Sequence, residues 1–176
     1  MSLTTCAIAI VASLVAAYTD ARTGRIPNWL TVPLLFAGPL LSLASTGMPG
    51  FLLSLLGLLL CGLAPLLLFA RNAMGGGDVK LFAALGGLLG THLGIEVQFF
   101  SFCVVAFVLL AHMAWDGRLF LTLKNVALAG GHIFLPKRYQ RPLAPAVMTQ
   151  VRMGVSICIA TLASVAIRTP YMPWLR

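Results

Sequence analysis

Two aspartates stand out because acidic residues are scarce, with four Asp and Glu among 176 residues. Asp20 lies between an apolar run and a basic loop, and Asp78 closes Gly75-Gly76-Gly77-Asp78 just before another apolar run. A carboxylate at a membrane boundary costs free energy, so each is a functional candidate. Two neighbouring carboxyls resist ionising together, so one can take a proton from water while the other donates one. A pair on one side of the membrane could therefore hydrolyse a peptide bond.

The glycines before Asp78 fit the same chemistry. Gly75 and Gly77 permit backbone geometry closed to other residues and let a substrate strand pass close by, so both are candidate substrate-binding residues. The helix dipole at the start of the following apolar run favours a negative charge on Asp78 and indicates it as the ionised partner. The alternatives are a helix cap for Asp78 and a surface ion pair with a nearby arginine for Asp20.

The remaining polar residues are weaker candidates. Asp116 is the reserve third carboxylate, and Glu96 is expected on the opposite side of the membrane. The histidines are dispersed and the cysteines all lie in apolar runs without a C-x-x-C pair, namely His92, His112 and His132, and Cys6, Cys61, Cys103 and Cys158. Metal sites need clustered ligands, so we predict neither a metal nor any other cofactor.

The composition defines the class of protein. The chain is 60% hydrophobic and 9% charged, whereas soluble domains carry about 25% charged residues. At about 20 residues per span, the length allows one polytopic membrane domain over residues 1–176. The net charge of +8 does not indicate nucleic acid, because the basic residues lie between apolar runs and are placed to contact anionic lipid.

Six apolar runs predict an all-α integral membrane protein with about six transmembrane helices. They are residues 2–18, 29–46, 51–70, 80–95, 97–115 and 151–168. An N-terminus outside puts residues 19–28, 71–79 and 116–150 in the cytoplasm, where they and the adjoining helix ends hold ten of the twelve Lys and Arg. The positive-inside rule supports this orientation. Both termini are then outside, and Asp20 and Asp78 share the cytoplasmic face of a bacterial inner membrane.

Three further features concern the elements themselves. Residues 118–128 predict an amphipathic helix in the membrane interface, within the long inner segment. A stripe of Gly86, Gly90 and Gly94 should let another helix approach closely. Prolines inside the second and third runs are expected to kink those helices, which neighbouring helices make tolerable in a membrane.

At these residues the chain resembles the type IV prepilin leader peptidases, membrane aspartic proteases of the Gly-x-Gly-Asp class. The matching segments are Gly75-Gly76-Gly77-Asp78-Val79-Lys80-Leu81 and the Asp20 setting Asp-x-Arg-x-x-x-Ile-Pro-Asn. The resemblance is strong over residues 18–31 and 73–90 and faint at Gly154-Val155. There, many relatives of the tight-adherence (Flp) type have Pro-Tyr-Gly, and this chain has Arg152-Met153-Gly154.

The resemblance implies a membrane aspartic endopeptidase that removes the short basic leader of prepilins at the cytoplasmic face, with Asp20 and Asp78 as catalytic residues. Larger members also carry a cysteine-bearing inner segment and methylate the new N-terminus. This sequence shows no such segment, so the small, peptidase-only form typical of Flp-like pilins fits better. The expected partners are prepilin or pseudopilin substrates and membrane lipid.

Three alternatives remain open. An ion-coupled transporter could use Asp20 and Asp78 as proton or cation sites, although such groups usually lie near the bilayer midplane. A noncatalytic pilus-assembly subunit could keep the fold. A phosphatidyl transferase would need more closely spaced carboxylates than this chain offers.

Overall fold

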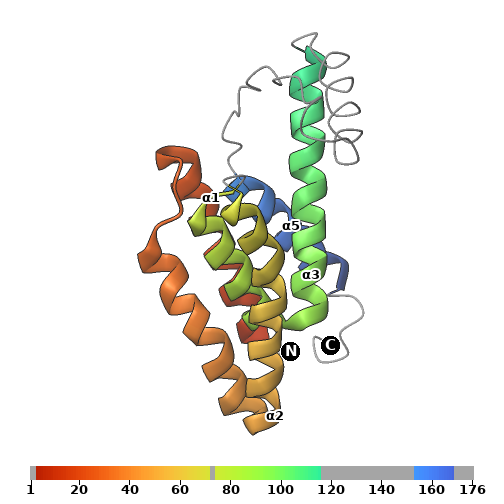
Figure 1. The fold of residues 1–176 in the computed structure, drawn as a ribbon. Coiled ribbons are helices and arrows are strands. Elements are labelled where there is room, and N and C mark those ends of the chain that lie inside the picture. The colour runs from red at the N-terminus through yellow and green to blue at the C-terminus, as the bar shows by residue number, and fades with distance from the viewer. Residues whose placement is uncertain (1–2, 72–73, 116–152, 169–176) are drawn as a thin grey trace, which may run out of the picture. The chain divides into compact units, whose positions relative to one another are not determined.

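The computed structural model describes residues 3–71, 74–115 and 153–168. They form α1 (Leu3–Thr23), α2 (Asn28–Ala70), α3 (Gly76–Trp115) and α5 (Met153–Arg168), as labelled in Figure 1. Within the described part, α1, α2 and α3 are long and apolar enough to cross a membrane, and α5 is a shorter apolar helix. The expected all-helical architecture is confirmed for these residues. The number of spans stays a prediction.

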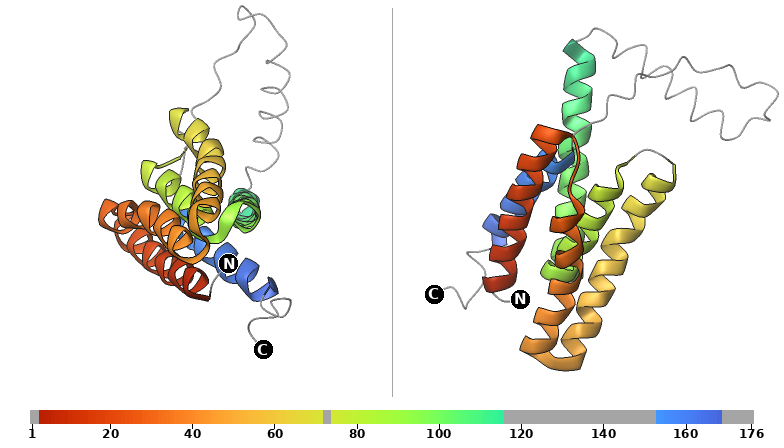
Figure 2. Two further views of the ribbon diagram at one scale, coloured as in Figure 1. Left: turned by 90° about the horizontal axis from the view of Figure 1, so that it is seen from below. Right: turned by 90° about the vertical axis from the view of Figure 1, so that its left-hand side faces the viewer.

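Helix α2 reverses direction at Gly47, where the chain turns from one arm to an antiparallel one (Figure 2). Gly47 has φ 71° and ψ −156°, a conformation that glycine adopts far more readily than other residues. Pro49 follows two residues later and suits the start of the second arm, because proline lacks the N–H that a first turn leaves unpaired. The turn falls between the predicted runs 29–46 and 51–70. Gly47 is the residue with non-helical backbone angles inside α2. The backbone therefore stays helical at Pro33, Pro39 and Pro65.

Helix α3 reverses in the same way, but six residues before the predicted boundary at Glu96. The break is at Gly90, with φ 78° and ψ 170°, inside the run 80–95 that was expected to be one helix. A Cβ on Gly94 would lie 2.8 Å from Gly86 Cα. The expected stripe on one helix face is therefore wrong, because Gly86 and Gly94 face each other across a turn made by Gly90.

The first arm of α3, residues 76–89, packs closely against α2. A Cβ on Gly38 would lie 2.7 Å from the Gly87 carbonyl carbon, and Gly57 and Gly86 meet backbone to backbone. Ser54 Oγ donates a 2.7 Å hydrogen bond to the Gly87 carbonyl oxygen. Both arms of α2 therefore contact the first arm of α3 through residues too small to separate the backbones.

Burial follows from this packing. Every residue from Leu81 to Leu89 is buried, and Leu81, Phe82 and Leu85 are among the largest fully buried side chains. The helix that begins at Gly76 thus forms much of the core. Its first residues, which include Asp78, are held in place by a well-packed segment.

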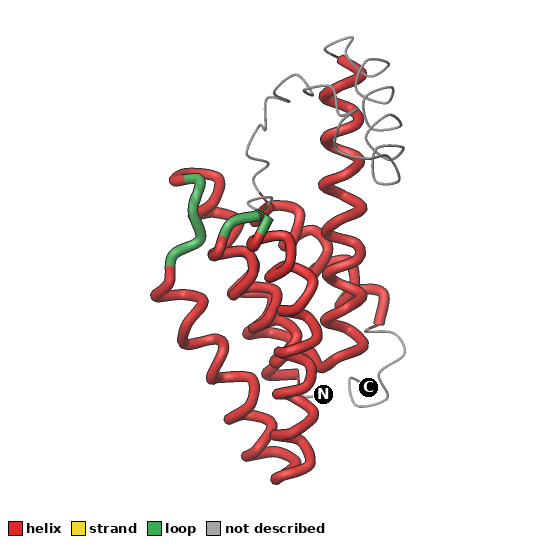
Figure 3. Tube along the Cα trace, in the orientation of Figure 1, coloured by secondary structure: helices red, strands yellow, loops and turns green. Residues whose placement is uncertain are grey.

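The connection between α1 and α2 is a short loop, drawn green in Figure 3. Gly24 ends α1 with φ 66°, and its N–H donates a 2.8 Å hydrogen bond to the Asp20 carbonyl oxygen. Glycine in this conformation is the usual residue after a helix C-terminus. Pro27, in extended geometry, precedes Asn28 at the start of α2. The short loop therefore keeps the last turn of α1, which carries Asp20, close to Asn28 at the start of α2.

Helix α5 packs along α1 in the opposite direction (Figure 2). The chain divides into two compact units, Met1–Val104 with Arg152–Arg176, and Val105–Val151. Both aspartates, α5 and the turns described above belong to the first unit. The predicted amphipathic helix over 118–128 lies outside the described residues, as does the whole of the predicted inner segment 116–150.

Candidate active site

Asp20 lies in the last turn of α1 and is buried, with 5% of its surface exposed. Its Oδ2 accepts a 2.9 Å hydrogen bond from the backbone N–H of Gly154, at the start of α5. A buried carboxylate is costly unless it is hydrogen-bonded. This donor, 134 residues away in sequence, offsets part of that cost. The expected surface ion pair does not describe this position, because the side chain is inside the protein.

Asp78 lies in the first turn of α3 and is half-buried. A backbone hydrogen bond links Gly75 to its carboxylate, and a Cβ on Gly75 would lie 3.0 Å from Asp78 Oδ2. A carboxylate three residues into a helix often reaches back in this way to the residue before the helix. Asp78 therefore caps α3, and the same cap fixes the direction of its carboxyl group.

The structure brings the two aspartates together, since Asp20 acts on Asp78 as a neighbouring like charge. They come from the end of one helix and the beginning of another, and a separate backbone N–H orients each of them. Two neighbouring carboxyls are the kind of side chains with which general acid–base hydrolysis of an amide can be carried out.

The two glycines expected to bind substrate have different surroundings. Gly75 is exposed, and its backbone holds the Asp78 carboxylate. Gly77 packs on the loop before α2, where an added Cβ would lie 2.9 Å from the Ile26 carbonyl oxygen and 3.0 Å from Ile26 Cβ. The positive φ values among the described glycines are at Gly24, Gly47 and Gly90. Glycine therefore fits at positions 75 and 77 because it has no side chain. The expectation of unusual backbone geometry at these two residues is wrong.

A second contact joins the same two segments. Lys80 Nζ donates a 2.8 Å hydrogen bond to Asn28 Oδ1, whereas the basic residues between apolar runs were expected to contact anionic lipid. Together with the contact of Gly77 on Ile26, it fastens the first turn of α3 to the first turn of α2. Sequence analysis missed this link, and its signal was present in the Ile26-Pro27-Asn28 and Asp78-Val79-Lys80 segments that carry the resemblance.

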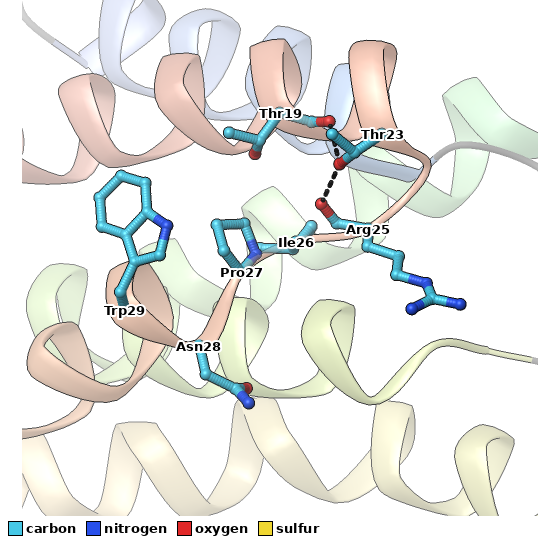
Figure 4. Close-up of a pocket in the computed structure, with 7 residues that line it drawn as sticks. All are labelled: Thr19, Thr23, Arg25, Ile26, Pro27, Asn28 and Trp29. Carbon is cyan, nitrogen blue, oxygen red and sulfur yellow. Dashed lines mark hydrogen bonds between the residues drawn. The ribbon is translucent and has the colours of Figure 1, made fainter.

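A cavity of about 440 Å³ opens where α1 ends and α2 begins. It is lined by Thr19, Thr23, Arg25, Ile26, Pro27, Asn28 and Trp29, which Figure 4 shows as sticks. Thr23 Oγ1 donates hydrogen bonds to the carbonyl oxygens of Thr19 and Arg25. The exposed indole of Trp29 and the guanidinium of Arg25 stand at its edges. Neither aspartate lines the cavity, but Thr19 precedes Asp20, and Ile26 contacts Gly77.

Glu96, the other acidic candidate that the structure describes, has a partner of its own. Glu96 Oε2 accepts a 2.6 Å hydrogen bond from Arg168 Nη2, which is an exposed ion pair at the end of α5. Asp116 and His132 lie outside the described residues. In the parts of the chain that the structure covers, there is no group of three His, Cys, Asp or Glu side chains that could hold a metal ion.

Comparison with known proteins gives one family and several relatives. The model of the type IV leader peptidase family matches residues 7–110. Prepilin leader peptidase/N-methyltransferases are 46% identical over 77 residues in Dickeya chrysanthemi, 40% over 83 in Klebsiella pneumoniae and 33% over 96 in Bacillus subtilis (strain 168). These matches cover 40%, 44% and 53% of this chain but 27%, 36% and 38% of those proteins. The chain thus matches well under half the length of these relatives. No solved structure matches it.

Proposed function

The chain belongs to the type IV leader peptidase family, and from this premise we propose that it is a membrane aspartic endopeptidase that cleaves the leader of type IV prepilins. The observation that carries the proposal is the pairing of Asp20 with Asp78 across two helices. Both carboxyls lie near helix ends, Asp20 in the last turn of α1 and Asp78 in the first turn of α3. This placement favours chemistry at a membrane surface over an ion path through the bilayer midplane.

In the proposed mechanism, one aspartate acts as the base and the other as the acid. A water molecule between the carboxyls loses a proton to the ionised aspartate and attacks the carbonyl carbon of the scissile peptide bond. The protonated aspartate hydrogen-bonds to the carbonyl oxygen and then a proton passes to the departing amine, so the C–N bond breaks and a carboxylic acid and an amine result. General acid–base assistance of this kind typically contributes 10²–10⁴-fold to a rate.

The substrate class is a leader peptide that is short and basic and precedes an apolar helix. We propose that Gly75 and Gly77 border the path of the peptide, with the exposed backbone of Gly75 closest to it. The relatives described above are named for leader cleavage and N-methylation, and this chain covers well under half of their length. We propose the peptidase activity for this chain, with small Flp-like pilins as its substrates.

We propose that the protein lies in the bacterial inner membrane, with both termini outside and the aspartate pair at the cytoplasmic face. The basis is the distribution of Lys and Arg between apolar runs. A basic leader would remain on this side while the apolar pilin helix occupies the membrane. The Asp20–Asp78 pair would then meet the junction between the two.

The test is co-expression with an Flp-like prepilin, followed by electrophoresis and mass spectrometry of the pilin N-terminus. We expect cleavage by the unmodified protein and none by Asp20→Asn or Asp78→Asn, since the amide keeps the size of the carboxyl but removes its ionisable proton. Glu96→Gln is the matched control and should cleave normally, as should Asp116→Asn. Cleavage by both aspartate variants would show that this is not an aspartic protease. An intact pilin in every lane would favour the noncatalytic assembly subunit.

A further inference from the structure

The start of α5 touches the catalytic pair through one residue. Gly154 is buried, and its backbone N–H donates the 2.9 Å hydrogen bond to Asp20 Oδ2. The first N–H groups of a helix have no acceptor within the helix. The Asp20 carboxyl therefore supplies the partner that the α5 backbone lacks at this point, and the α5 N–H supplies the donor that buried Asp20 needs.

Glycine is required here for space. A Cβ on Gly154 would lie 2.8 Å from Asp20 Cβ, 3.0 Å from Asp20 Oδ2 and 3.1 Å from the Ala16 carbonyl oxygen. Two of these atoms are fixed to the α1 backbone and cannot move aside without moving the helix. Gly154 is not among the glycines with positive φ, so an alanine would be compatible with its backbone geometry. The side chain of any other residue would push Asp20 and α5 apart.

We infer that Gly154 is a positioning residue for Asp20, which fixes the rotation of the catalytic carboxyl by a backbone hydrogen bond. Holding Oδ2 stops the carboxyl group from turning and presents it in one orientation to the water that it shares with Asp78. The dipole at the start of α5 adds a favourable field for a negative carboxylate. The contribution comes from a backbone N–H and a missing side chain. It therefore does not depend on the side chains of the two preceding residues, Arg152 and Met153.

The inference rests on the proposed peptidase, and Gly154→Ala tests it kinetically in purified protein in detergent. Displacement of a reacting group by about 1 Å can lower a rate on the order of 100-fold. We expect a fall of that order in kcat with KM changed less than about twofold, because Gly154 contacts Asp20 and not the substrate. The control is Gly62→Ala, whose Cβ would approach Ala83 Cβ to 3.2 Å, a helix contact away from the pair. It should keep its kcat.

A second measurement needs no peptidase activity and covers the case in which Gly154→Ala fails to fold. In protein labelled with ¹⁵N-glycine, the Gly154 amide should exchange with deuterium at least roughly tenfold faster in Asp20→Ala than in the unmodified chain, since its acceptor is gone. Asp78→Ala should leave this amide unchanged, and Gly57 should be unchanged in both variants.

The outcomes separate the two proposals. Unchanged Gly154 exchange in Asp20→Ala, or a Gly154→Ala variant with raised KM and normal kcat, would overturn the positioning role. If the Gly154 amide exchanges faster in Asp20→Ala but the unmodified protein cleaves no prepilin, the hydrogen bond to Asp20 is supported. Only the proposed peptidase function is then overturned.

Discussion

Lys80 and Asn28 are joined by a 2.8 Å hydrogen bond between Nζ and Oδ1, across 52 residues of sequence. It links the first turn of α3, which carries Asp78, to the first turn of α2, which follows the Asp20 loop. Gly77, in the same turn of α3, packs on Ile26 in the loop just before α2. The two segments that identify the family are therefore one structural unit, with one aspartate beside each half.

The first prediction concerns this link. Lys80→Met and Asn28→Ala should each lower the rate of prepilin cleavage, because the first turn of α3 loses a tether to the α2 loop. The bond is exposed, so the loss of stability should be at most about 1 kcal/mol. A double-mutant cycle with thermal denaturation and cleavage rates measures the coupling. Arg22→Met is the control, since it removes a positive charge that lies over Tyr18 instead of joining two helices. Additive losses in the cycle would contradict the link.

The second prediction concerns the aspartates as a unit. If the two carboxyls act on one water, removing either should abolish nearly all catalysis, and the double variant should be little slower than either single one. Single-turnover assays of Asp20→Asn, Asp78→Asn and the double variant measure this. Multiplicative losses would indicate two independent roles. A normal rate in Asp20→Asn with an inactive Asp116→Asn would show that the partner of Asp78 was misassigned.

A third prediction concerns the packing of α3 between the arms of α2. Gly86→Ala should destabilise the protein by about 1–3 kcal/mol, as overpacking typically does, because its Cβ would collide with the Gly57 carbonyl and Cys61. Gly87→Ala is a neighbouring control, since its Cβ would meet atoms no closer than 3.6 Å. Melting temperatures in detergent compare the two variants. Equal melting temperatures would mean that the two helices are not in this close contact.

The fourth prediction concerns orientation. Single cysteines at Arg25→Cys and Arg71→Cys, both at exposed positions, should react in intact cells only with a reagent that crosses the inner membrane, if both loops face the cytoplasm. The four native cysteines are replaced by serine in the background chain. Labelling of the two sites from opposite sides would put the two aspartates on opposite sides of the membrane and exclude the catalytic pair.

The sequence predicted those elements whose signals are local. The apolar runs locate α1 and both arms of α2, and the polar residues after Asp20 and before Asp78 mark two helix ends. The reversal at Gly90 was not predicted in this way, because the polar residues Thr91 and His92 that follow it are too few to interrupt an apolar run that resumes at Leu93. Gly154 and Asp20, 134 residues apart, form a contact that depends on tertiary packing and leaves no spacing pattern.

The reversal at Gly90 also makes one arm of α3 short. Residues 76–89 extend roughly 21 Å at 1.5 Å per residue, whereas the hydrocarbon layer of a bilayer is about 30 Å thick. An arm of this length cannot match an undisturbed bilayer, so either the lipid thins around it or the Gly90 turn stays within the apolar layer, shielded where Thr91 N lies against Gly57. Hydrophobic mismatch acts directly on such a segment. The acyl-chain length of the surrounding lipid should therefore affect the first arm of α3, which carries Asp78 in its first turn.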